Sequence, residues 1–355
     1  MSAVAIAATS SSSAPTNSSA PEEKKDVNNK GKTFKIYIVL WATKDALVKG
    51  FMDYMERQKI KAEYTLRYCD QNKEKCHDFV KEIRDIKPDL IFTWGTPACE
   101  AIAGTIDAPN KQDYIWDIPM ISLIVTDPIK SKLIYDMKKT GRNITGVNHV
   151  APISSHIEAM KSYLKDLKKV ATLYNPAETN SGIMVKELQK IGPDFELEVS
   201  DHPIPVDENG QPIVEKIEEE VEKIAKEGAQ FIYIPAESFL SINIKHVMDV
   251  ANKHKLLTIG TTEYTFFFGP RPLMGLLSRF YDVGLFGGFK AEQILIHGEK
   301  PENIPYEKLK TFSLLLAPEV FRNIKVYPPL SMIKYAEILP ELNSDKNIER
   351  NNNDS

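Results

Sequence analysis

Short apolar runs alternate with amphipathic segments along most of the chain. Residues 34–41 read FKIYIVLW, a nearly continuous apolar run of the kind that forms a buried strand of a parallel sheet. Residues 44–58 follow, with Leu47, Phe51 and Tyr54 at the spacing of one face of a helix. Strands that alternate with helices in this way predict an α/β fold of parallel sheets flanked by helices.

The alternation runs along the chain and starts again near residue 154. We expect strands at 34–41, 62–68, 90–94, 119–125, 144–147, 170–174, 195–199, 231–234, 256–259, 273–279 and 312–316. We expect helices at 44–58, 75–86, 96–106, 129–139, 154–167, 181–191, 214–227, 240–254, 282–297, 318–324 and 330–339. Two such series in tandem predict two similar lobes, each a parallel sheet flanked by helices, with a ligand cleft between them.

The same pattern sets the expected boundaries of the parts. They are a disordered leader or tether at 1–33, a first lobe at 34–147 with a return segment at about 270–300, a second lobe at 148–262 with a return segment at about 305–340, and a disordered tail at 341–355. Residues 1–8 are apolar, but no basic region precedes them. They are either the remnant of a secretion signal or the start of a plain disordered tail.

Composition and charge narrow the possible functions. The chain has 355 residues and a formal net charge of −4, so no overall basic field is present to hold nucleic acid. Hydrophobic residues make up 42% of the chain, yet no apolar run is long enough to span a membrane. We therefore expect a globular protein that binds no nucleic acid.

The chain has three cysteines, Cys69, Cys76 and Cys99, which is no disulfide framework. We expect all three to be free or packed. Cys69 and Cys76 could pair only if their Cα atoms approach within about 7 Å, which sequence cannot show. No second pair of ligands has usable spacing, so we expect no metal site.

Ligands of open parallel sheets bind outside the carboxyl ends of the strands, where helix N-termini also point. The loops that follow the predicted strands carry short polar side chains beside aromatic ones, a mixture that suits a ligand site. The candidate ligand-binding residues are Trp41, Thr43, Trp94, Gly95, Thr96, Thr126, Asp127, Asn175, Asn180, Glu237, Ser238 and Asp282.

Many of these residues also have a purely structural interpretation. Thr43, Thr96, Asn180 and Ser238 are all credible helix N-caps, and a capped helix start can still present its amides to an anion. Asp127, which precedes Pro128 at a predicted helix start, and Asp282 are each either a helix cap or, like Glu237, a counter-ion for an ammonium group.

The aromatic candidates are open to two interpretations as well. Trp41 and Trp94 end neighbouring strands, so they either belong to the core or stack on a planar or apolar ligand. The apolar segment 264–269 (YTFFFG) either packs at a hinge or lines the cleft.

Sequence signatures of catalysis are missing. The chain has no glycine-rich phosphate loop, no G-x-S-x-G elbow and no H-E-x-x-H motif. No histidine falls in a predicted ligand-side loop beside a serine or cysteine nucleophile. We therefore expect a binding protein that needs no cofactor, although a dyad of distant residues stays possible.

Five short motifs, in order, resemble one family. They are IFTWGTPA at 91–98, VTDP at 125–128, GRNITGV at 141–147, LYNP at 173–176 followed by Asn180 and Ser181, and ILIHGEKP at 294–301. Together they resemble the ABC-transporter substrate-binding proteins of the type I periplasmic-binding fold, which includes tryptophan- and phenylalanine-binding members. The resemblance covers residues 34–339.

The resemblance implies a two-lobed clamp that closes on an amino acid. Its carboxylate would be held by amides and hydroxyls and its ammonium by an acid, and the anchoring loops would fall on Thr96, Asp127, Asn175, Glu237 and Asp282. It also implies an exported monomer, periplasmic or at the cell surface, that works with ABC permease subunits. The chain departs from the family pattern in the aromatic segment 264–269 and in having glutamate at 237.

Two alternatives to an importer component stay open. The same fold serves as a ligand sensor or adaptor that signals to a partner protein. An enzyme could also use the cleft between the lobes as its active site.

Overall fold

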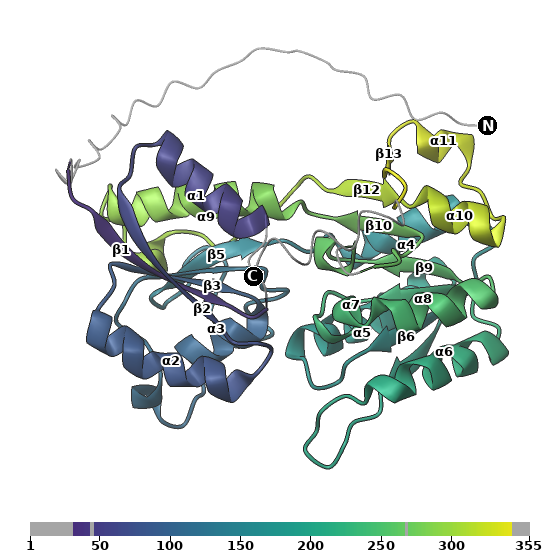
Figure 1. The fold of residues 1–355 in the computed structure, drawn as a ribbon, viewed down its shortest axis with the longest axis horizontal. Helices are drawn as coiled ribbons and strands as arrows, with labels where there is room; N and C mark the ends of the chain where they lie inside the picture. The colour runs from purple at the N-terminus through teal and green to yellow at the C-terminus, as the bar shows by residue number, and fades with distance from the viewer. Residues whose placement is uncertain (1–30, 43–45, 267–268, 343–355) are drawn as a thin grey trace.

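The computed structural model of the chain describes residues 31–42, 46–266 and 269–342, which form two α/β lobes side by side (Figure 1). Nearly all of the predicted leader and tail, and the candidate residue Thr43, lie outside the described residues. Among the described helices, none has the length and apolar character needed to cross a membrane.

The first lobe contains a six-stranded sheet in which every described pairing is parallel. Its strands, in spatial order, are β11 (Glu307–Lys308), β5 (Ile144–Asn148), β4 (Met120–Leu123), β3 (Leu90–Trp94), β1 (Phe34–Leu40) and β2 (Ala62–Tyr68). Its helices are α1 (Ala46–Arg57), α2 (Lys73–Ile86), α3 (Thr96–Ala103) and α9 (Phe280–Leu295). Helices α1 and α9 cover one face of the sheet, and α2 and α3 cover the other (Figure 1).

The second lobe contains a seven-stranded sheet that is parallel except for one antiparallel pair, β10 with β12. Its strands, in spatial order, are β13 (Glu337–Ile338), β12 (Ser313–Leu316), β10 (Met274–Leu277), β9 (Leu257–Gly260), β8 (Phe231–Ile234), β6 (Lys169–Tyr174) and β7 (Glu198–Pro203). Its helices are α4 (Ile153–Tyr163), α5 (Thr179–Ile191), α6 (Ile217–Lys226), α7 (Phe239–Ile242), α8 (Ile244–Lys253), α10 (Pro318–Ile324) and α11 (Leu330–Ile333).

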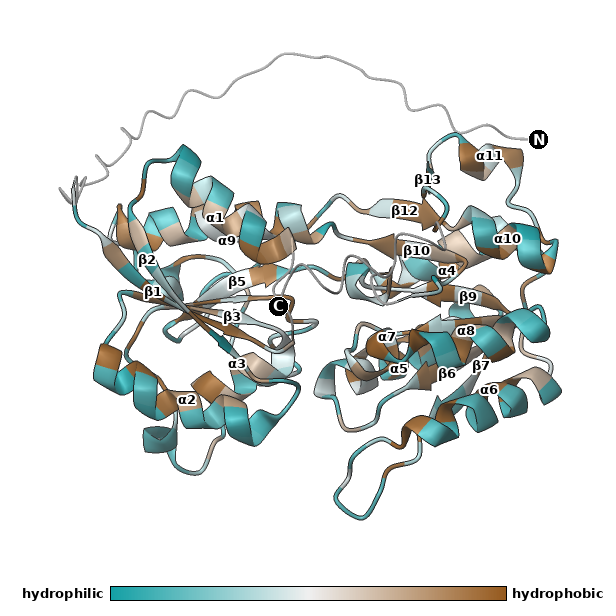
Figure 2. Cartoon of the chain, in the orientation of Figure 1, coloured by the Kyte–Doolittle hydropathy of each residue, from teal (hydrophilic) through white to brown (hydrophobic). Residues whose placement is uncertain are grey.

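Apolar residues fill each lobe separately. The central strand β3 is buried at every position, as its continuous apolar sequence predicts, whereas β2 at the edge of the sheet is only partly covered. Figure 2 shows the apolar residues along the strands and the polar residues on the outward faces of the helices. The buried residues form one large cluster in each lobe, so the chain is long enough for two cores.

The chain passes between the two sheets after β5, after β10 and after β11. These connecting segments lie against one another. The Ser278 hydroxyl donates to the His149 carbonyl oxygen at 2.6 Å, and the Leu309 N–H donates to the Asn148 carbonyl oxygen at 3.1 Å. The connections therefore form one bundle, and the cleft lies beside it.

Most of the predicted strands and helices are confirmed, but the helix expected at 129–139 is wrong. This segment is a series of turns. The Asp127 carboxylate accepts the N–H groups of Ile129 and Lys130, and Lys132 is left-handed, with φ 56°. Side-chain hydrogen bonds of this kind compete with a helix for the backbone, which the apolar spacing does not reveal.

Three other predicted elements differ. The helix expected at 330–339 ends at Ile333 as α11, and residues 337–338 form strand β13 instead. The helix expected at 240–254 is divided at Asn243 into α7 and α8. The strand expected at 195–199 begins only at Glu198, because residues 192–195 form a 3-10 turn.

Helices α1 and α9 pack closely because glycines lie at their contact. A Cβ atom on Gly284 of α9 would overlap the Leu47 carbonyl oxygen, and a Cβ atom on Gly50 of α1 would overlap the Tyr281 carbonyl oxygen. Since these are backbone atoms, they cannot move aside without shifting a helix. The glycines therefore set the distance between the two helices.

The substitution Gly284→Ala should lower the free energy of unfolding by about 1–3 kcal/mol, because it forces the two helices apart. Gly182 in α5 is the matched control: a Cβ there would meet nothing within 4 Å, so Gly182→Ala should raise stability slightly through helix propensity. Urea unfolding of both variants measures the difference. Equal effects of the two substitutions would contradict the packing argument.

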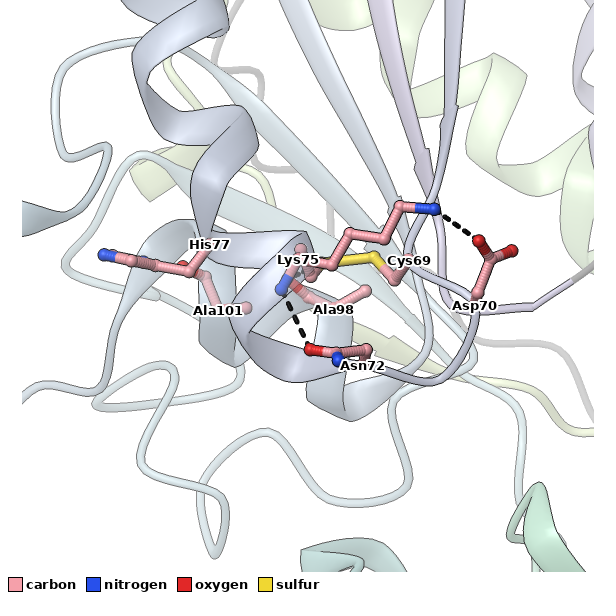
Figure 3. Close-up of a disulfide and its surroundings, with 8 residues drawn as sticks. Cys69, Asp70, Asn72, Lys75, His77, Ala98 and Ala101 are labelled. Carbon is pink, nitrogen blue, oxygen red and sulfur yellow. Dashed lines mark hydrogen bonds and ion pairs between the residues drawn. A yellow bond between two sulfur atoms is a disulfide. The ribbon is translucent and has the colours of Figure 1, made fainter.

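Cys69 and Cys76 form a disulfide, with their Cα atoms 4.6 Å apart, so the expectation of free cysteines was wrong for this pair. The bond joins the loop after β2 to the first turn of α2 (Figure 3). Asn72 caps this helix, since its side-chain oxygen accepts the Lys75 N–H at 2.9 Å. Cys99 is free and buried, as expected.

Reduction of the Cys69–Cys76 disulfide should lower the free energy of unfolding by about 2–3 kcal/mol, the amount expected for a loop of this length. Thermal or urea unfolding with and without a reductant measures this loss. The double variant Cys69→Ala with Cys76→Ala is the control, because a reductant should not change its stability. A wild-type protein that is insensitive to the reductant would contradict the prediction.

Candidate ligand-binding site

A cavity of about 360 Å³, counting the solvent at its mouth, lies where the carboxyl ends of the two sheets meet. The first lobe lines it with Trp41, Trp94, Gly95, Thr96, Pro97, Ile124 and Thr126. The second lobe lines it with Glu178, Asn180, Ala236, Glu237, Ser238, Thr262 and Tyr264. The segment after β5 adds His149, and the first residue of α9 adds Phe280.

Gly95 allows the first-lobe wall to form. It joins β3 to α3 with φ 95° and ψ 148°, a conformation that side-chain-bearing residues rarely adopt. A Cβ atom at this position would lie only 3.2 Å from the Cβ of Trp41. A glycine therefore lets Trp41 lie against the start of α3.

Ile124 shows backbone strain at the same wall. It follows β4 with φ 58°, which is unusual for a β-branched residue and costs of the order of 1–3 kcal/mol. Such conformations persist where the surrounding structure enforces them, and they concentrate at functional sites.

Three aromatic rings form the apolar part of the cavity. The ring of Trp94 meets Tyr264 edge-on at a centroid distance of 5.4 Å, and it meets Phe280 at 6.4 Å. Tyr264 belongs to the aromatic segment 264–269 and lines the cavity, whereas Phe266 packs against Leu277 in the second lobe. Within this segment, Tyr264 therefore lines the cleft and Phe266 is packed away from it.

Two buried acids form the polar wall on the second lobe. Glu178 is at the N-cap position of α5, and its carboxylate accepts hydrogen bonds from the Ser238 hydroxyl at 2.5 Å and from the Asn180 amide at 3.3 Å. The Glu237 carboxylate accepts the N–H groups of Phe239 at 3.0 Å and Leu240 at 2.7 Å. Glu178 is 8% exposed and Glu237 is 4% exposed.

Burial controls the charges in this cavity. It raises the pKa of Glu178, and the hydrogen bonds from Ser238 oppose that rise only in part. It also raises the pKa of Glu237 well above its usual value, and the neighbouring Glu178 charge adds to this. Burial lowers the pKa of His149 to about 3, so its imidazole is neutral at ordinary pH. Burial therefore favours the uncharged forms of both acids and of the histidine, and the histidine supplies no positive charge.

The lobes touch across the cavity. The Trp41 indole N–H donates to the Ser238 hydroxyl oxygen at 3.0 Å, and that hydroxyl in turn donates to Glu178. At the rim, the Lys130 ammonium of the first lobe lies 2.8 Å from the Glu187 carboxylate of α5. The cleft is therefore narrowed by direct contacts between the lobes.

Most of the predicted site residues come together. Those that line the cavity are Trp41, Trp94, Gly95, Thr96, Thr126, Asn180, Glu237 and Ser238. The side chains of Thr96, Asn180 and Ser238 do not cap their helices, so the capping interpretation was wrong for these three.

Asp127, Asn175 and Asp282 do not line the cavity. Asp127 and Asn175 stabilise turns, accepting the N–H groups of Ile129 and Ala177. Asp282 lies inside the first turn of α9 and is not its N-cap; the N–H of Phe280 at that helix start is instead accepted by Glu263 at 2.6 Å.

The sequence reasoning missed Glu178, His149 and Phe280, whereas Tyr264 belongs to the segment 264–269, for which lining the cleft was one of two interpretations. Glu178 comes directly before α5, in the ligand-side loop after β6, but glutamate is not a typical N-cap, and the predicted helix began only at residue 181. His149 lies on the segment after β5 and Phe280 is the first residue of α9, and only the three-dimensional arrangement brings them to the cavity.

No group of His, Cys, Asp and Glu side chains is placed to hold a metal ion in the described part of the chain. The described lining residues also include no lysine or arginine. The site therefore suits a ligand that itself carries a positive charge and an apolar part.

Comparisons with known proteins agree with this geometry. A family model described as ABC transporter substrate binding protein matches residues 36–338. A tyrosine-binding protein from Clostridioides difficile (strain R20291) is 24% identical over 306 residues, which cover 85% of this chain and 83% of that protein.

Solved structures share the fold. A conserved domain protein from Vibrio cholerae has a TM-score of 0.76 at 19% identity, with 86% of this chain and 99% of the other covered. An ABC domain from Streptococcus pneumoniae in complex with L-Trp has a TM-score of 0.73 at 20% identity, with 86% and 100% covered. An open, ligand-free substrate-binding protein with adhesive properties from Clostridium difficile has a TM-score of 0.66 at 18% identity, with 87% and 100% covered.

These likenesses confirm the type I periplasmic-binding-protein fold that the sequence predicted. The family model extends from the third residue of β1 to the end of β13 and so includes both lobes and the cavity between them. Proteins of this family bind small ligands outside the cytoplasm and work with ABC transporters. The chain belongs to the ABC transporter substrate-binding protein family.

Proposed function

We propose that this chain captures a small amino acid with an aromatic or apolar side chain outside the cytoplasm and delivers it to the permease of an ABC importer. The observation that carries the proposal is the cavity itself. It brings two buried carboxyl groups, Glu178 and Glu237, into one cavity with the aromatic side chains of Trp94 and Tyr264.

The chemistry of the walls suits each part of such a ligand. An ammonium group would lie against the acids of the second lobe, and an apolar side chain would pack on Trp94, Tyr264 and Phe280. The carboxylate would face the start of α3, where Thr96 and the backbone N–H groups carry partial positive charge. The names of two relatives, a tyrosine-binding protein and an L-Trp complex, support an aromatic amino acid.

Lobe closure is part of the proposal. We take residues 148–152, the segment after β10 and the segment after β11 as the hinge. The lobes follow the two sheets, so β10 belongs to the second lobe and β11 to the first, which differs from the return segments expected at about 270–300 and 305–340. The Trp41–Ser238 hydrogen bond and the Lys130–Glu187 ion pair would then form on closing and break on opening.

The remaining features favour an exported binding protein that acts as a monomer and catalyses no reaction. The Cys69–Cys76 disulfide suits an oxidising compartment. Ser238 is the serine among the described lining residues, and its hydroxyl donates to Glu178 rather than to the neutral His149. The structure therefore pairs no nucleophile with this histidine in the described cavity wall. Thr43, which the structure does not describe, stays a predicted ligand contact.

L-Tyrosine and L-tryptophan should stabilise the protein against thermal unfolding. At 100 times the dissociation constant, the expected gain is about 2.7 kcal/mol. The deaminated analogue 3-(4-hydroxyphenyl)propionate is the control, because it lacks the ammonium group that the two acids would hold. No stabilisation by any amino acid, or an equal effect of the deaminated analogue, would contradict the proposal.

The substitution Trp41→Phe should weaken binding by removing the hydrogen bond between the lobes while keeping an aromatic ring. A loss of about 1 kcal/mol corresponds to roughly a fivefold higher dissociation constant, mostly through faster dissociation. Calorimetry and stopped-flow displacement of bound L-tyrosine measure the two quantities. Trp116→Phe is the matched control, because Trp116 packs on Arg142 away from the cavity. Unchanged dissociation in Trp41→Phe would show that this contact does not hold the lobes together.

A further inference from the structure

Glu178 and Glu237 reach one small volume from two different loops. Glu178 ends the loop after β6, and Glu237 lies in the loop after β8. They share a donor, because the Phe239 N–H lies 3.0 Å from the Glu237 carboxylate and 3.4 Å from the Glu178 carboxylate. Two groups that can each carry a negative charge therefore lie close together and away from water.

No described cation of the cavity wall compensates them. His149, on the segment after β5, is neutral because of its burial, and Tyr264 faces the cavity from the turn after β9. α7 contributes no titratable side chain. α3 contributes Glu100, which Lys73 pairs at 2.7 Å, and the buried thiol of Cys99. Among the other nearby charges, Arg279 is paired with Glu263 at 2.8 Å and Lys130 with Glu187 at the rim.

Like charges at close approach in a dry site disfavour double ionisation, so such a pair holds a proton that an isolated carboxylate would release. The donors show which group keeps the charge. Glu178 accepts hydrogen bonds from Ser238, through both its hydroxyl and its N–H, and from Asn180, whereas Glu237 accepts only backbone N–H groups. Glu178 is therefore the better-stabilised anion, and Glu237 is the site of the proton.

A third polar group lies unused beside the pair. The side-chain oxygen of Asn180 is buried in the cavity wall and has no hydrogen-bond partner in the structure. An ammonium group that entered here could donate to this oxygen as well as to Glu178 and Glu237. The site is thus arranged for a donor with several N–H groups and one positive charge.

We infer that, in the free protein, the carboxyl groups of Glu178 and Glu237 share a single proton, and that the ammonium group of the ligand takes its place on binding. The incoming positive charge makes double ionisation favourable, so Glu237 releases its proton to solvent while the ligand keeps its own protons. One positive charge thus replaces another. The shared proton is a property of the free protein, whereas its replacement rests on the proposed amino-acid ligand.

The shared proton can be tested without a ligand. Infrared spectra of the free protein at neutral pH should show the C=O stretch of a protonated buried carboxyl group, and Glu237→Gln should remove it. Glu220→Gln is the matched control: Glu220 is 7% exposed but is paired with Lys223, so its loss should leave the band unchanged. The absence of the band from the wild type would overturn the inference.

A second variant keeps the inference testable if the Glu237→Gln protein does not fold. Glu178→Gln removes the neighbouring negative charge, so the band of Glu237 should titrate at a lower pH than in the wild type. A titration that does not move would show that the two carboxyl groups are independent, which would also overturn the inference.

Proton release on binding is measured with L-tyrosine by calorimetry in buffers of different ionisation enthalpy. The wild type should release close to one proton per ligand at neutral pH, and Glu237→Gln should release none. In the pH range where the free protein still holds the shared proton, binding must expel that proton. The wild-type dissociation constant should therefore fall about tenfold for each unit by which the pH rises.

The outcomes separate the two ideas. If neither L-tyrosine nor L-tryptophan binds while the infrared band is present, the proposed ligand is wrong and the shared proton stands. If L-tyrosine binds without releasing a proton, the exchange is wrong and the proposed function stands.

Discussion

Each sheet of this protein is built almost wholly from parallel strands, and parallel pairing brings all their carboxyl ends to one edge of the sheet. The loops after β1, β3 and β4 must therefore lie together, and so must the loops after β6, β8 and β9. Because connecting segments hold the two edges face to face, short loops from distant parts of the sequence meet in one cavity. Every polar or aromatic group of the site owes its position to this constraint.

Within the cavity, groups are held in states that would be unfavourable elsewhere. Two carboxyl groups are buried, a histidine is neutral, and Ile124 has a left-handed backbone. Each state lowers stability, and the two lobe cores compensate for that loss. A ligand that supplies a positive charge would offset part of this loss of stability. The affinity for such a ligand therefore depends on the charges of the second-lobe wall.

The sequence predicted the two lobes well, because buried parallel strands such as β3 read as continuous apolar runs. It failed at 129–139, where Asp127 and Arg142 take up backbone groups that a helix would use; the Arg142 guanidinium donates to the Leu133 carbonyl oxygen at 3.1 Å. For the site, strand ends identified Trp94 and Glu237. They could not separate Glu237 from Asp127, because both follow strands and only the direction of each side chain distinguishes them. Glu178, which packs against Ser238 from a distant loop, depends on contacts that no local pattern encodes.

The interleaving of the chain between the lobes has a consequence for biosynthesis. Helix α9 covers α1, β4 and β5 of the first lobe, yet it is encoded after most strands of the second lobe, and the edge strand β11 follows later still. A chain that emerges from the ribosome at roughly 5–20 residues per second therefore exposes the apolar face of its first lobe until α9 has been made. Neither lobe can finish folding as an independent unit while translation continues. The nascent protein should consequently be a natural client of chaperones that shield apolar surface, and a chain held incompletely folded in this way is also in a state suited to passage through a membrane channel.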